Sequence, residues 1–568
     1  MPGHYTERNF EDHIEEHLLA TGYHQRLPGD YDKTLCLVPA ELLTFIQTSQ
    51  PQAYQQLENQ FGPDTPTKLA ERLATEINKR GALDVLRHGI KTRGVQFQLA
   101  YRRPANQMNP DHWALYQQNR FSIVRQLKYS QKNENSIDMV LFLNGLPIIT
   151  AELKNSLTGQ FVENAIKQYK EDRLPKGEPF LQYKRCLVHF AVGNEKAFMT
   201  TRLRGSQTRF FPFNLDTENP INPNGHQTAY LWEDIWQPDT LLLLISNYLH
   251  IQTNTERRYD PQAGKVVEVT SEAFIFPRYH QLDVVRQVLT AVQQEGAGRS
   301  YLIQHSAGSG KSNSIAWLAH QLANLYQHPT DKERLFDSII VVTDRRVLDS
   351  QLQNTIKQFE QTAGVVVPID KDSQQLKKAL QDGKAIIITT LQKFPVISQT
   401  TAALKGQKFA VIIDEAHSSQ SGESAKHLKQ VLSPTQMTGT QESASHPADD
   451  EFDIEDAIVE EIRLRGRQDH ISYFAFTATP KNKTLELFGR ENPDGQFVAF
   501  HNYWMRQAIE ENFILDVLKN YTTFERYFKL VKKIEGDKEY EKRKALTLLK
   551  SHVDLQPHAI EMKTRIML

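Results

Sequence analysis

The chain has 568 residues, with 67 Lys and Arg against 68 Asp and Glu, so its formal charge at pH 7 is −1. At roughly 150 residues per domain, this length predicts about three to four domains. Hydrophobic residues make up 39% and charged residues 24%, which excludes a disordered tail protein, a collagen and a disulfide scaffold. The balanced charge excludes a wholly basic DNA-coating protein but is compatible with a local basic groove.

The chain also lacks the marks of a membrane or secreted protein. No stretch approaches the roughly 18 consecutive apolar residues that a transmembrane helix needs, and the N-terminus, MPGHYTERNF, has no apolar signal region. Only two cysteines occur, Cys36 and Cys186, so a disulfide framework is not expected and a reducing compartment fits. We therefore expect a large, soluble, cytoplasmic protein without membrane association.

The first half of the chain alternates helical and strand patterns. A helix is predicted over 6–20, because Phe10, Ile14 and Leu18 recur on one face. The remaining expectations are mostly helical structure over 25–80, strands at 94–101 and 137–143, a helix over 161–172, a strand at 183–192 and irregular connections over 205–265. These elements predict a mixed sheet with flanking helices.

Two carboxylates and a lysine lie on neighbouring strands of this predicted sheet. Asp138 begins one strand, a turn follows at Asn144-Gly145, and Glu152 and Lys154 lie in the next strand. Residues two apart on a strand face the same side. Converging carboxylates can bind one or two Mg²⁺ ions that polarise a phosphodiester and activate water, and a lysine can position the nucleophile. The pattern predicts a metal-dependent nuclease.

The position of Asp138 depends on the hairpin loop. An odd-length loop, such as 144–146, puts Asp138 opposite Glu152, whereas a two-residue loop puts it on the other face. The nuclease hypothesis therefore requires an odd loop. The alternative is a solvated strand face, since Glu-x-Lys also occurs at 561–563 without an upstream Asp hairpin. The apolar stretches 139–143 and 146–149 argue against an exposed hairpin.

Other signals in this half are weaker. His13-Ile-Glu-Glu16-His17 matches a zinc-protease pattern, but no third ligand is evident and a solvated helix face is the simpler interpretation. Glu11 on the same helix could lie near the nuclease metals. Residues 91–103 interleave basic and aromatic side chains, which suits a phosphate backbone or an ordinary edge strand equally well.

From about residue 275 the pattern changes to that of a parallel sheet covered on both faces. A helix over 281–294 is followed by short apolar runs separated by helical stretches, a texture typical of such sheets. The runs are 301–304, 339–342, 385–388, 410–413 and 473–476. Residues 433–461 interrupt this pattern, and 449–461 contains eight carboxylates in thirteen residues, so we expect a mobile surface insertion.

A phosphate-binding loop is predicted after the first of these runs. His305-Ser-Ala-Gly308-Ser309-Gly310-Lys311-Ser312 lies between a strand and a helix, although His305 stands where the strict pattern has glycine. Small residues let backbone N–H groups converge on phosphate oxygens. Lys311 would reach the β- and γ-phosphates and Ser312 would bind Mg²⁺. The alternative is a Gly/Ser turn.

A second acidic pair strengthens the nucleotide hypothesis. Asp414-Glu415 ends the strand at 410–413, where Asp414 could bind Mg²⁺ and Glu415 could activate the attacking water. With these motifs the sequence resembles the superfamily 2 helicases and translocases. In that resemblance Gln281 reads adenine, Thr343–Arg346 and Thr389–Gln392 hold a nucleic-acid backbone, and Thr477-Ala-Thr479 couples ATP state to DNA grip.

The pairing of Asp138, Glu152 and Lys154 with a downstream motor resembles the restriction (R) subunit of type I restriction–modification enzymes. Phrases at 505–510 and 513–521 also resemble this family. The resemblance implies a PD-(D/E)xK-type nuclease domain, a RecA-like motor lobe, ATP-driven translocation of double-stranded DNA, and assembly with modification (methyltransferase) and specificity subunits. The domains would be 1–260 (nuclease), 266–500 (first ATPase lobe) and 501–568 (connector and start of a truncated second lobe).

The chain departs from the family in two respects. The family often has Gln four residues before a Tyr on the helix after the lysine, but here Ala165 takes that offset from Tyr169 and Gln168 is its direct neighbour. The Arg-rich motif of a second motor lobe does not follow Lys550. Two other functions stay open: a superfamily 2 helicase or remodelling ATPase whose N-terminal domain only binds DNA, and a nucleotide-gated assembly module.

Overall fold

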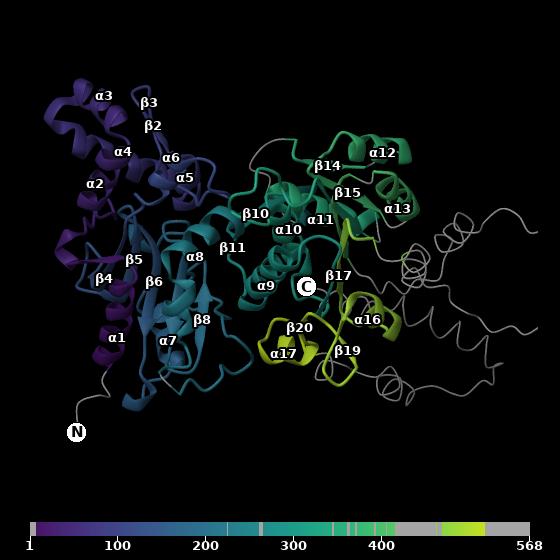
Figure 1. Cartoon of the computed structure of the whole chain (residues 1–568). Helices are drawn as coiled ribbons and strands as arrows, with labels where there is room; N and C mark the ends of the chain where they lie inside the picture. The colour runs from purple at the N-terminus through teal and green to yellow at the C-terminus, as the bar shows by residue number, and fades with distance from the viewer. Residues whose placement is uncertain are drawn as a thin grey trace, which may run out of the picture. The chain divides into compact units, whose positions relative to one another are not determined.

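The computed structural model describes residues 7–516 except 224, 261–264, 344–345, 360–363, 370–371, 391–392, 405, 415–461 and 463–467. Contacts divide the chain into Met1–Ile514 and Leu515–Leu568, and every element named below lies in the first unit. Figure 1 labels these helices and strands. The predicted insertion at 433–461 lies outside the described residues. Among the described helices, none combines the length and the apolar character needed to cross a bilayer.

A mixed seven-stranded sheet forms the N-terminal region, with the strand order β1-β4-β5-β6-β7-β8-β9. The pairs β1–β4 and β6–β7 are parallel and the others are antiparallel. The strands are β1 (Tyr23–Arg26), β4 (Phe121–Lys128), β5 (Ser136–Leu143), β6 (Leu146–Leu153), β7 (Val188–Val192), β8 (Ala197–Thr200) and β9 (Phe211–Pro212).

Both faces of strand β5 are buried, which explains why the predicted hairpin is so apolar. Met139 and Leu141 join one hydrophobic core, whereas Val140 and Phe142 join another. Tyr169 of helix α7 (Val162–Glu171) belongs to the second core. Because side chains alternate along a strand, Asp138 shares the α7 side with Val140 and Phe142.

The N-terminal helices match most of the predictions. The predicted helices over 6–20 and 161–172 are confirmed as α1 (Glu7–Ala20) and α7, and 25–80 is mostly helical as expected. The further helices are α2 (Pro39–Ser49), α3 (Pro51–Phe61), α4 (Thr65–Arg80), α5 (Ala82–His88) and α6 (Pro110–Tyr116). The strand predicted at 94–101 is only β3 (Val95–Phe97), paired with β2 (Ile90–Thr92), and that at 183–192 begins at Val188.

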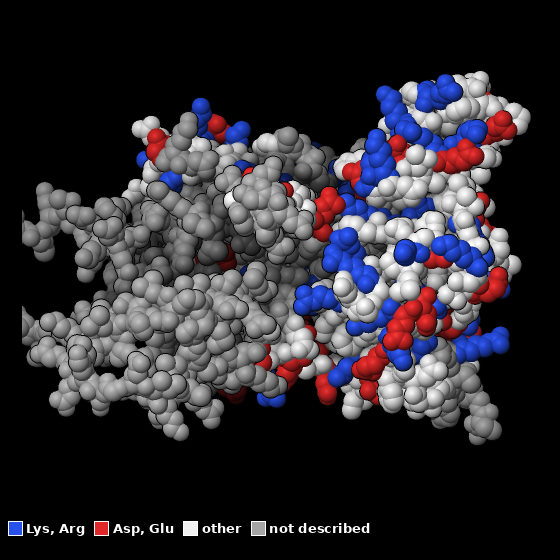
Figure 2. All heavy atoms as spheres, turned by 180° about the vertical axis from the view of Figure 1, so that it is seen from behind, with Lys and Arg blue, Asp and Glu red and all other residues white. Residues whose placement is uncertain are grey.

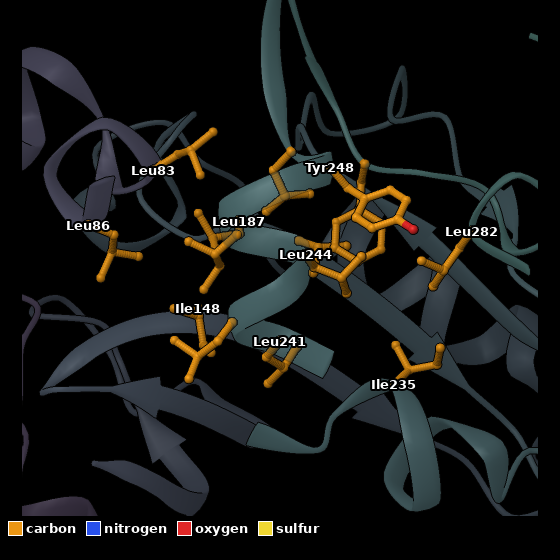
Figure 3. Close-up of a cluster of buried hydrophobic side chains, with 14 of the residues drawn as sticks. Leu83, Leu86, Ile148, Leu187, Ile235, Leu241, Leu244, Tyr248 and Leu282 are labelled. Carbon is orange, nitrogen blue, oxygen red and sulfur yellow. The ribbon is translucent and has the colours of Figure 1, made fainter. Parts of the chain in front are cut away.

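The expectation of irregular structure over 205–265 is wrong for its second half. Residues 231–248 contain the π-helices η5 (Leu231–Ile235) and η6 (Leu244–Tyr248) on either side of α8 (Pro238–Leu243), and β10 (His250–Asp260) pairs with β11 (Lys265–Ile275). The polar composition of the whole window hid the local apolar run at 241–245. Buried side chains of this segment pack with Ile148 of β6 and Leu282 of the next helix (Figure 3).

The region after residue 275 contains a second seven-stranded sheet, with the order β14-β15-β13-β16-β17-β12-β20. Every pairing recorded in it is parallel, as the apolar runs predict. Its strands are β12 (Ser300–His305), β13 (Ser338–Thr343), β14 (Val366–Pro368), β15 (Ile386–Thr390), β16 (Phe409–Asp414), β17 (Ile471–Thr477) and β20 (His501–Tyr503).

Helices and one short hairpin complete this region. The helix predicted over 281–294 is confirmed as α9 (Tyr279–Glu295) and ends at Gly296, whose φ is 74°. The others are α10 (Lys311–Leu322), α11 (Arg346–Gln358), α12 (Ser373–Gln381), α13 (Phe394–Ala403), α16 (Asn482–Phe488) and α17 (Met505–Glu510), and β18 (Arg490–Glu491) pairs with β19 (Phe497–Val498).

Candidate active sites

The β5–β6 hairpin turns in two residues, so it lacks the odd loop that the nuclease hypothesis required. Leu143 pairs with Leu146, and Asn144 and Gly145 form the turn with φ of 51° and 83°, as in the turns that favour Asn-Gly. A Cβ atom on Gly145 would lie 2.6 Å from the Val38 carbonyl oxygen. Glycine is therefore required there by both conformation and space.

A β-bulge restores the parity that the odd loop was expected to supply. Phe142 pairs with Pro147 and Leu141 with Ile149, which leaves Ile148 unpaired, and beyond it Met139 pairs with Ala151. Continuing this register by one position puts Asp138 opposite Glu152 on the α7 side. A bulge suits Pro147, since proline has no N–H for a central strand.

The carboxylate of Asp138 receives three donors. The backbone N–H of Leu153 donates to Oδ2 at 2.8 Å, the ammonium of Lys154 lies 3.5 Å from the same oxygen, and the amide of Gln126 donates to Oδ1 at 3.2 Å. The side chain of Asp138 is buried. These contacts hold the carboxylate against the end of β6.

Glu152 lies in the sheet interior with one oxygen paired and one without a donor. Its side chain is 0% exposed, and the Arg173 guanidinium donates to Oε1 at 2.7 Å. Oε2 is buried and receives no hydrogen bond from the residues that the structure describes. Burial, and then the nearby Asp138, raises the pKa of Glu152 well above its ordinary value despite Arg173. The site thus favours a proton or a cation on this carboxylate.

Lys154 follows the last residue of β6 and is held in the same place. Its backbone N–H donates to the Val192 carbonyl of β7, and its ammonium donates to the Leu153 carbonyl at 3.0 Å besides contacting Asp138. The side chain is buried. Asp138, Glu152 and Lys154 therefore converge.

Two further residues join this cluster from outside the hairpin. Gln126 in β4 donates to both Glu11 of α1, at 2.9 Å, and Asp138. Its φ is 47°, a left-handed conformation that is unusual for a non-glycine residue within a strand. Burial, and then Asp138, raises the pKa of Glu11. A cavity of about 470 Å³ beside Glu11, Gln126 and Arg125 opens next to the cluster.

Helix α7, which follows Lys154 along the chain, supports the strand that carries Glu152. The Tyr169 hydroxyl is 2.8 Å from the Thr150 hydroxyl, which in turn contacts His189 Nδ1 at 2.7 Å. Thr150 lies two residues before Glu152 on the same face of β6, so Tyr169 supports the strand that carries the carboxylate. Gln168 is half-buried. No hydrogen bond from Gln168 or Tyr169 to the two carboxylates is recorded in the described part of the chain.

The predicted phosphate-binding loop lies between strand β12 and helix α10. Gly308 and Gly310 have φ of 77° and 76°, and Gly310 precedes the first residue of the helix, Lys311. The Lys311 ammonium donates to the His305 carbonyl at 3.4 Å. Ser309 is buried and Ser312 is half-buried. Small residues in left-handed conformations directed into a helix N-terminus form the cradle expected for phosphate.

Gln281 of α9 lies against this loop. Its amide nitrogen donates to the Gly310 carbonyl at 3.0 Å, and its amide oxygen accepts from the Arg278 backbone N–H. A cavity of about 460 Å³ beside Gln281, Gly310 and Arg278 also contacts Phe513. The geometry leaves room for a base-sized group next to the residue predicted to recognise adenine.

The remaining predicted motor residues lie at strand ends. Asp414 is the last residue of β16, and Thr343, Thr390 and Thr477 end β13, β15 and β17. In a parallel sheet these ends share the edge at which β12 leads into the phosphate loop. Glu415 lies outside the described residues, as do Asp344, Arg345, Leu391 and Gln392.

The first histidine of the HxxEH motif of α1 makes ring contacts. The His13 ring packs against His226 and Trp232, with centroids 5.6 and 5.9 Å apart. Charged groups of both signs are intermixed over the described part of the face in Figure 2. The described part of this face therefore presents local charges of both signs and no uniform field.

Two family descriptions match the chain. "Type I restriction enzyme R protein N terminus (HSDR_N)" matches residues 4–208 and "SWI2/SNF2 ATPase" matches residues 280–445. The type I restriction enzyme HindI endonuclease subunit of Haemophilus influenzae is 27% identical over 333 residues, covering 55% of this chain and 28% of that protein. The SauCOLORF180P endonuclease subunit of Staphylococcus aureus strain COL is 23% identical over 419 residues, covering 71% and 36%.

A solved fragment of an HsdR subunit from Vibrio vulnificus YJ016 covers 67% of this chain and 52% of that chain, at 15% identity and a TM-score of 0.25. The sequence matches and the two sheets define a class: an α/β protein in which a mixed-sheet domain precedes a parallel-sheet superfamily 2 ATPase lobe.

Within that class, the chain is a homologue of the R subunit (HsdR) of type I restriction enzymes, with an HSDR_N region and a SWI2/SNF2 ATPase region. It spans about a third of the length of the curated relatives it matches, 28% and 36% for the two described above.

Proposed function

We propose that the chain acts as part of the restriction subunit of a type I restriction enzyme. In this proposal the subunit couples ATP-driven translocation of double-stranded DNA to Mg²⁺-dependent phosphodiester cleavage. It does so in a complex with modification and specificity subunits. The observation that carries this proposal is the convergence of Asp138, Glu152 and Lys154 in a chain that also holds a phosphate-binding loop. We assign nuclease function to 1–260, the first ATPase lobe to 266–500 and a connector to 501–568.

The acidic cluster fits a divalent cation. Glu152 Oε2 has no donor among the described residues and lies beside Asp138. Carboxylate oxygens are the hard donors that Mg²⁺ prefers. Within the described residues, no three His, Cys, Asp or Glu side chains are grouped to hold a metal. Water and a DNA phosphate would therefore complete the coordination, as is usual for Mg²⁺.

Each residue of the proposed nuclease site has a role. Asp138 and Glu152 would hold Mg²⁺, whose charge polarises the scissile phosphate and makes the attacking water more acidic. Arg173 keeps Glu152 Oε1 engaged, so Oε2 would be the oxygen that holds the cation. Lys154 would orient the nucleophile and offset negative charge as it develops on the phosphate.

The proposed ATPase roles follow the loop geometry. Backbone N–H groups of Gly308 to Gly310 would cradle the phosphates, with Lys311 on the β- and γ-phosphates. Ser312 and Asp414 would bind the Mg²⁺ that accompanies ATP, Glu415 would activate water, and Gln281 would contact adenine. This proposal is supported by Asp414, which ends β16 at the edge of the sheet where β12 leads into the loop.

The test uses the complete subunit assembled with its modification and specificity subunits. Glu152→Ala should abolish Mg²⁺-dependent cleavage of plasmid DNA and leave ATP hydrolysis intact, because the two sites lie on separate sheets. Glu163→Ala, an exposed carboxylate on α7, is the matched control and should cleave normally. Normal cleavage by Glu152→Ala would refute the nuclease assignment. Absence of nicking in the unaltered assembly would favour an ATPase whose N-terminal domain only binds DNA.

A further inference from the structure

The phosphate loop begins with a buried histidine. His305 ends β12, is 0% exposed and occupies the position that small residues take in loops of this type. Its carbonyl accepts from the Lys311 ammonium at 3.4 Å. Because the His305 ring is larger than the usual residue, its placement constrains the backbone from which the loop departs. The contacts that hold this ring therefore bear on the conformation of the loop.

Two hydrogen bonds in series hold the His305 ring. His305 Nε2 lies 2.8 Å from His501 Nδ1, and His501 Nε2 lies 3.0 Å from Asp283 Oδ2. His501 belongs to β20, and Asp283 lies on α9 two residues after Gln281. These two hydrogen bonds thus join three elements: the start of the phosphate loop, the helix that carries Gln281 and the strand at the edge of the sheet.

The chemistry of the three groups gives these bonds a direction. A carboxylate only accepts, so His501 donates to Asp283 through Nε2–H. Burial, and then the neighbouring His501, His280 and Lys311, holds the pKa of His305 well below its ordinary value, so this ring is neutral. With the Nε2 proton of His501 directed to Asp283, Nδ1 of His501 can accept a hydrogen bond from His305 Nε2–H. His305 Nδ1, buried and without a hydrogen-bond partner among the described residues, is the unprotonated nitrogen of that tautomer.

Strand β20 is fastened to the loop by further contacts. His305 pairs with Tyr503 in the sheet, and the Ser306 N–H donates to the Tyr503 carbonyl at 3.0 Å. The Tyr503 ring stacks on His280 at 3.6 Å, and His280 Nε2 contacts the Ser309 carbonyl at 3.2 Å. A side-chain bond between His501 and His305 therefore acts at a point where the backbone of β20 already fixes the loop.

We propose that His501 is a positioning residue for the nucleotide site. It holds the His305 ring, and through it the start of the phosphate loop, in the conformation that binds phosphate, while Asp283 orients the His501 ring. This inference rests on the proposed nucleotide binding by the loop. It extends that proposal to a residue almost two hundred positions downstream, on a strand that follows the Thr477–Thr479 motif.

The test is a double-substitution cycle on the full chain, with affinity for MgADP measured by calorimetric titration. His501→Phe keeps a ring but removes both hydrogen bonds, and should weaken MgADP binding about tenfold, as expected when a buried donor loses its partner. His501→Asn keeps an acceptor near the position of Nδ1 and should recover part of the loss. In a His305→Gly background, where the loop has its usual small residue, His501→Phe should change affinity less than about twofold, because the two effects are coupled.

Two controls separate the possible failures. His470→Phe removes a histidine that contacts the Thr401 carbonyl in the same sheet region and should leave MgADP affinity unchanged. Lys311→Ala tests the underlying nucleotide site: if it leaves affinity unchanged, the proposed function fails. If Lys311→Ala abolishes binding while His501→Phe has no effect, or has the same effect in both backgrounds, the positioning role of His501 is refuted.

Discussion

The two sheets of this chain bring reactive side chains together in different ways. In the ATPase sheet the recorded pairings are parallel, so the loop after β12 and the end of β16 reach one edge by topology alone. In the N-terminal sheet Asp138 and Glu152 lie within antiparallel strands, and one unpaired residue, Ile148, decides whether they face each other. The first arrangement tolerates local variation, whereas the second depends on register.

The largest expected effect tests whether the register-dependent site is the nuclease. Asp138→Asn should reduce DNA cleavage by the assembled complex by about 1,000-fold or more, since the cation that polarises the phosphate loses a charged ligand. MgADP affinity should change less than twofold. An Asp138→Asn complex that cleaves at the normal rate would show that facing carboxylates in this sheet serve only its structure.

The reciprocal substitution tests the topology-dependent site. Lys311→Ala should weaken MgADP binding about 100-fold, because a buried ammonium that pairs with phosphate is lost. Mn²⁺ binding at the acidic cluster, measured by titration, should be unaffected. Lys332→Ala, an exposed lysine in the same lobe, serves as the control and should bind MgADP normally. Equal loss in both variants would point to general electrostatics instead of a specific loop contact.

A smaller effect is expected from Glu11, which contacts the cluster through Gln126. Glu11→Gln removes a negative charge near Asp138 and should weaken Mn²⁺ binding about tenfold, as for residues that support metal ligands. Glu16→Gln alters an exposed carboxylate on the same helix and should have no effect. If the two variants bind Mn²⁺ equally, α1 contributes nothing to the site.

The smallest effect is a pH dependence confined to the N-terminal site. Because the pKa of Glu152 is raised, a proton competes with the cation, and Mn²⁺ affinity should fall by up to about tenfold per pH unit below that pKa. When a chelator removes the metal, the folding stability depends on pH in the opposite direction. The folded chain binds this proton more tightly than the unfolded chain, so stability falls as pH rises from the ordinary Glu value through the raised one. Glu152→Gln should remove this fall in melting temperature.

The contrast between the sheets also explains what could be predicted from sequence. Apolar runs, a glycine-rich loop and Asp414 at a strand end are local patterns, and they suffice where topology fixes the site. The predicted partnership of Asp138 and Glu152 needed a count of loop residues, and the hairpin has two where the hypothesis required an odd number. Pro147 within an apolar strand was the available signal, since proline in a central strand indicates a bulge.

Other features had no readable signal. The left-handed backbone of Gln126 and its contacts with Glu11 and Asp138 depend on the packing of α1 against β4. Arg173 reaches Glu152 from the end of α7, 21 residues further along the chain. The pairing of His305 with His501 joins residues 196 positions apart. Such contacts depend on tertiary structure rather than on local sequence.

The most direct measurement is the anomalous scattering of Mn²⁺ in crystals grown with the metal. A peak is expected about 2 Å from Glu152 Oε2 and from a carboxylate oxygen of Asp138, with the Glu152–Arg173 pair retained. Crystals of Glu152→Gln should lack this peak. A map in which Mn²⁺ is absent from the two carboxylates, while Lys154 and Arg173 keep their present contacts, would contradict the assignment of this hairpin as a nuclease site.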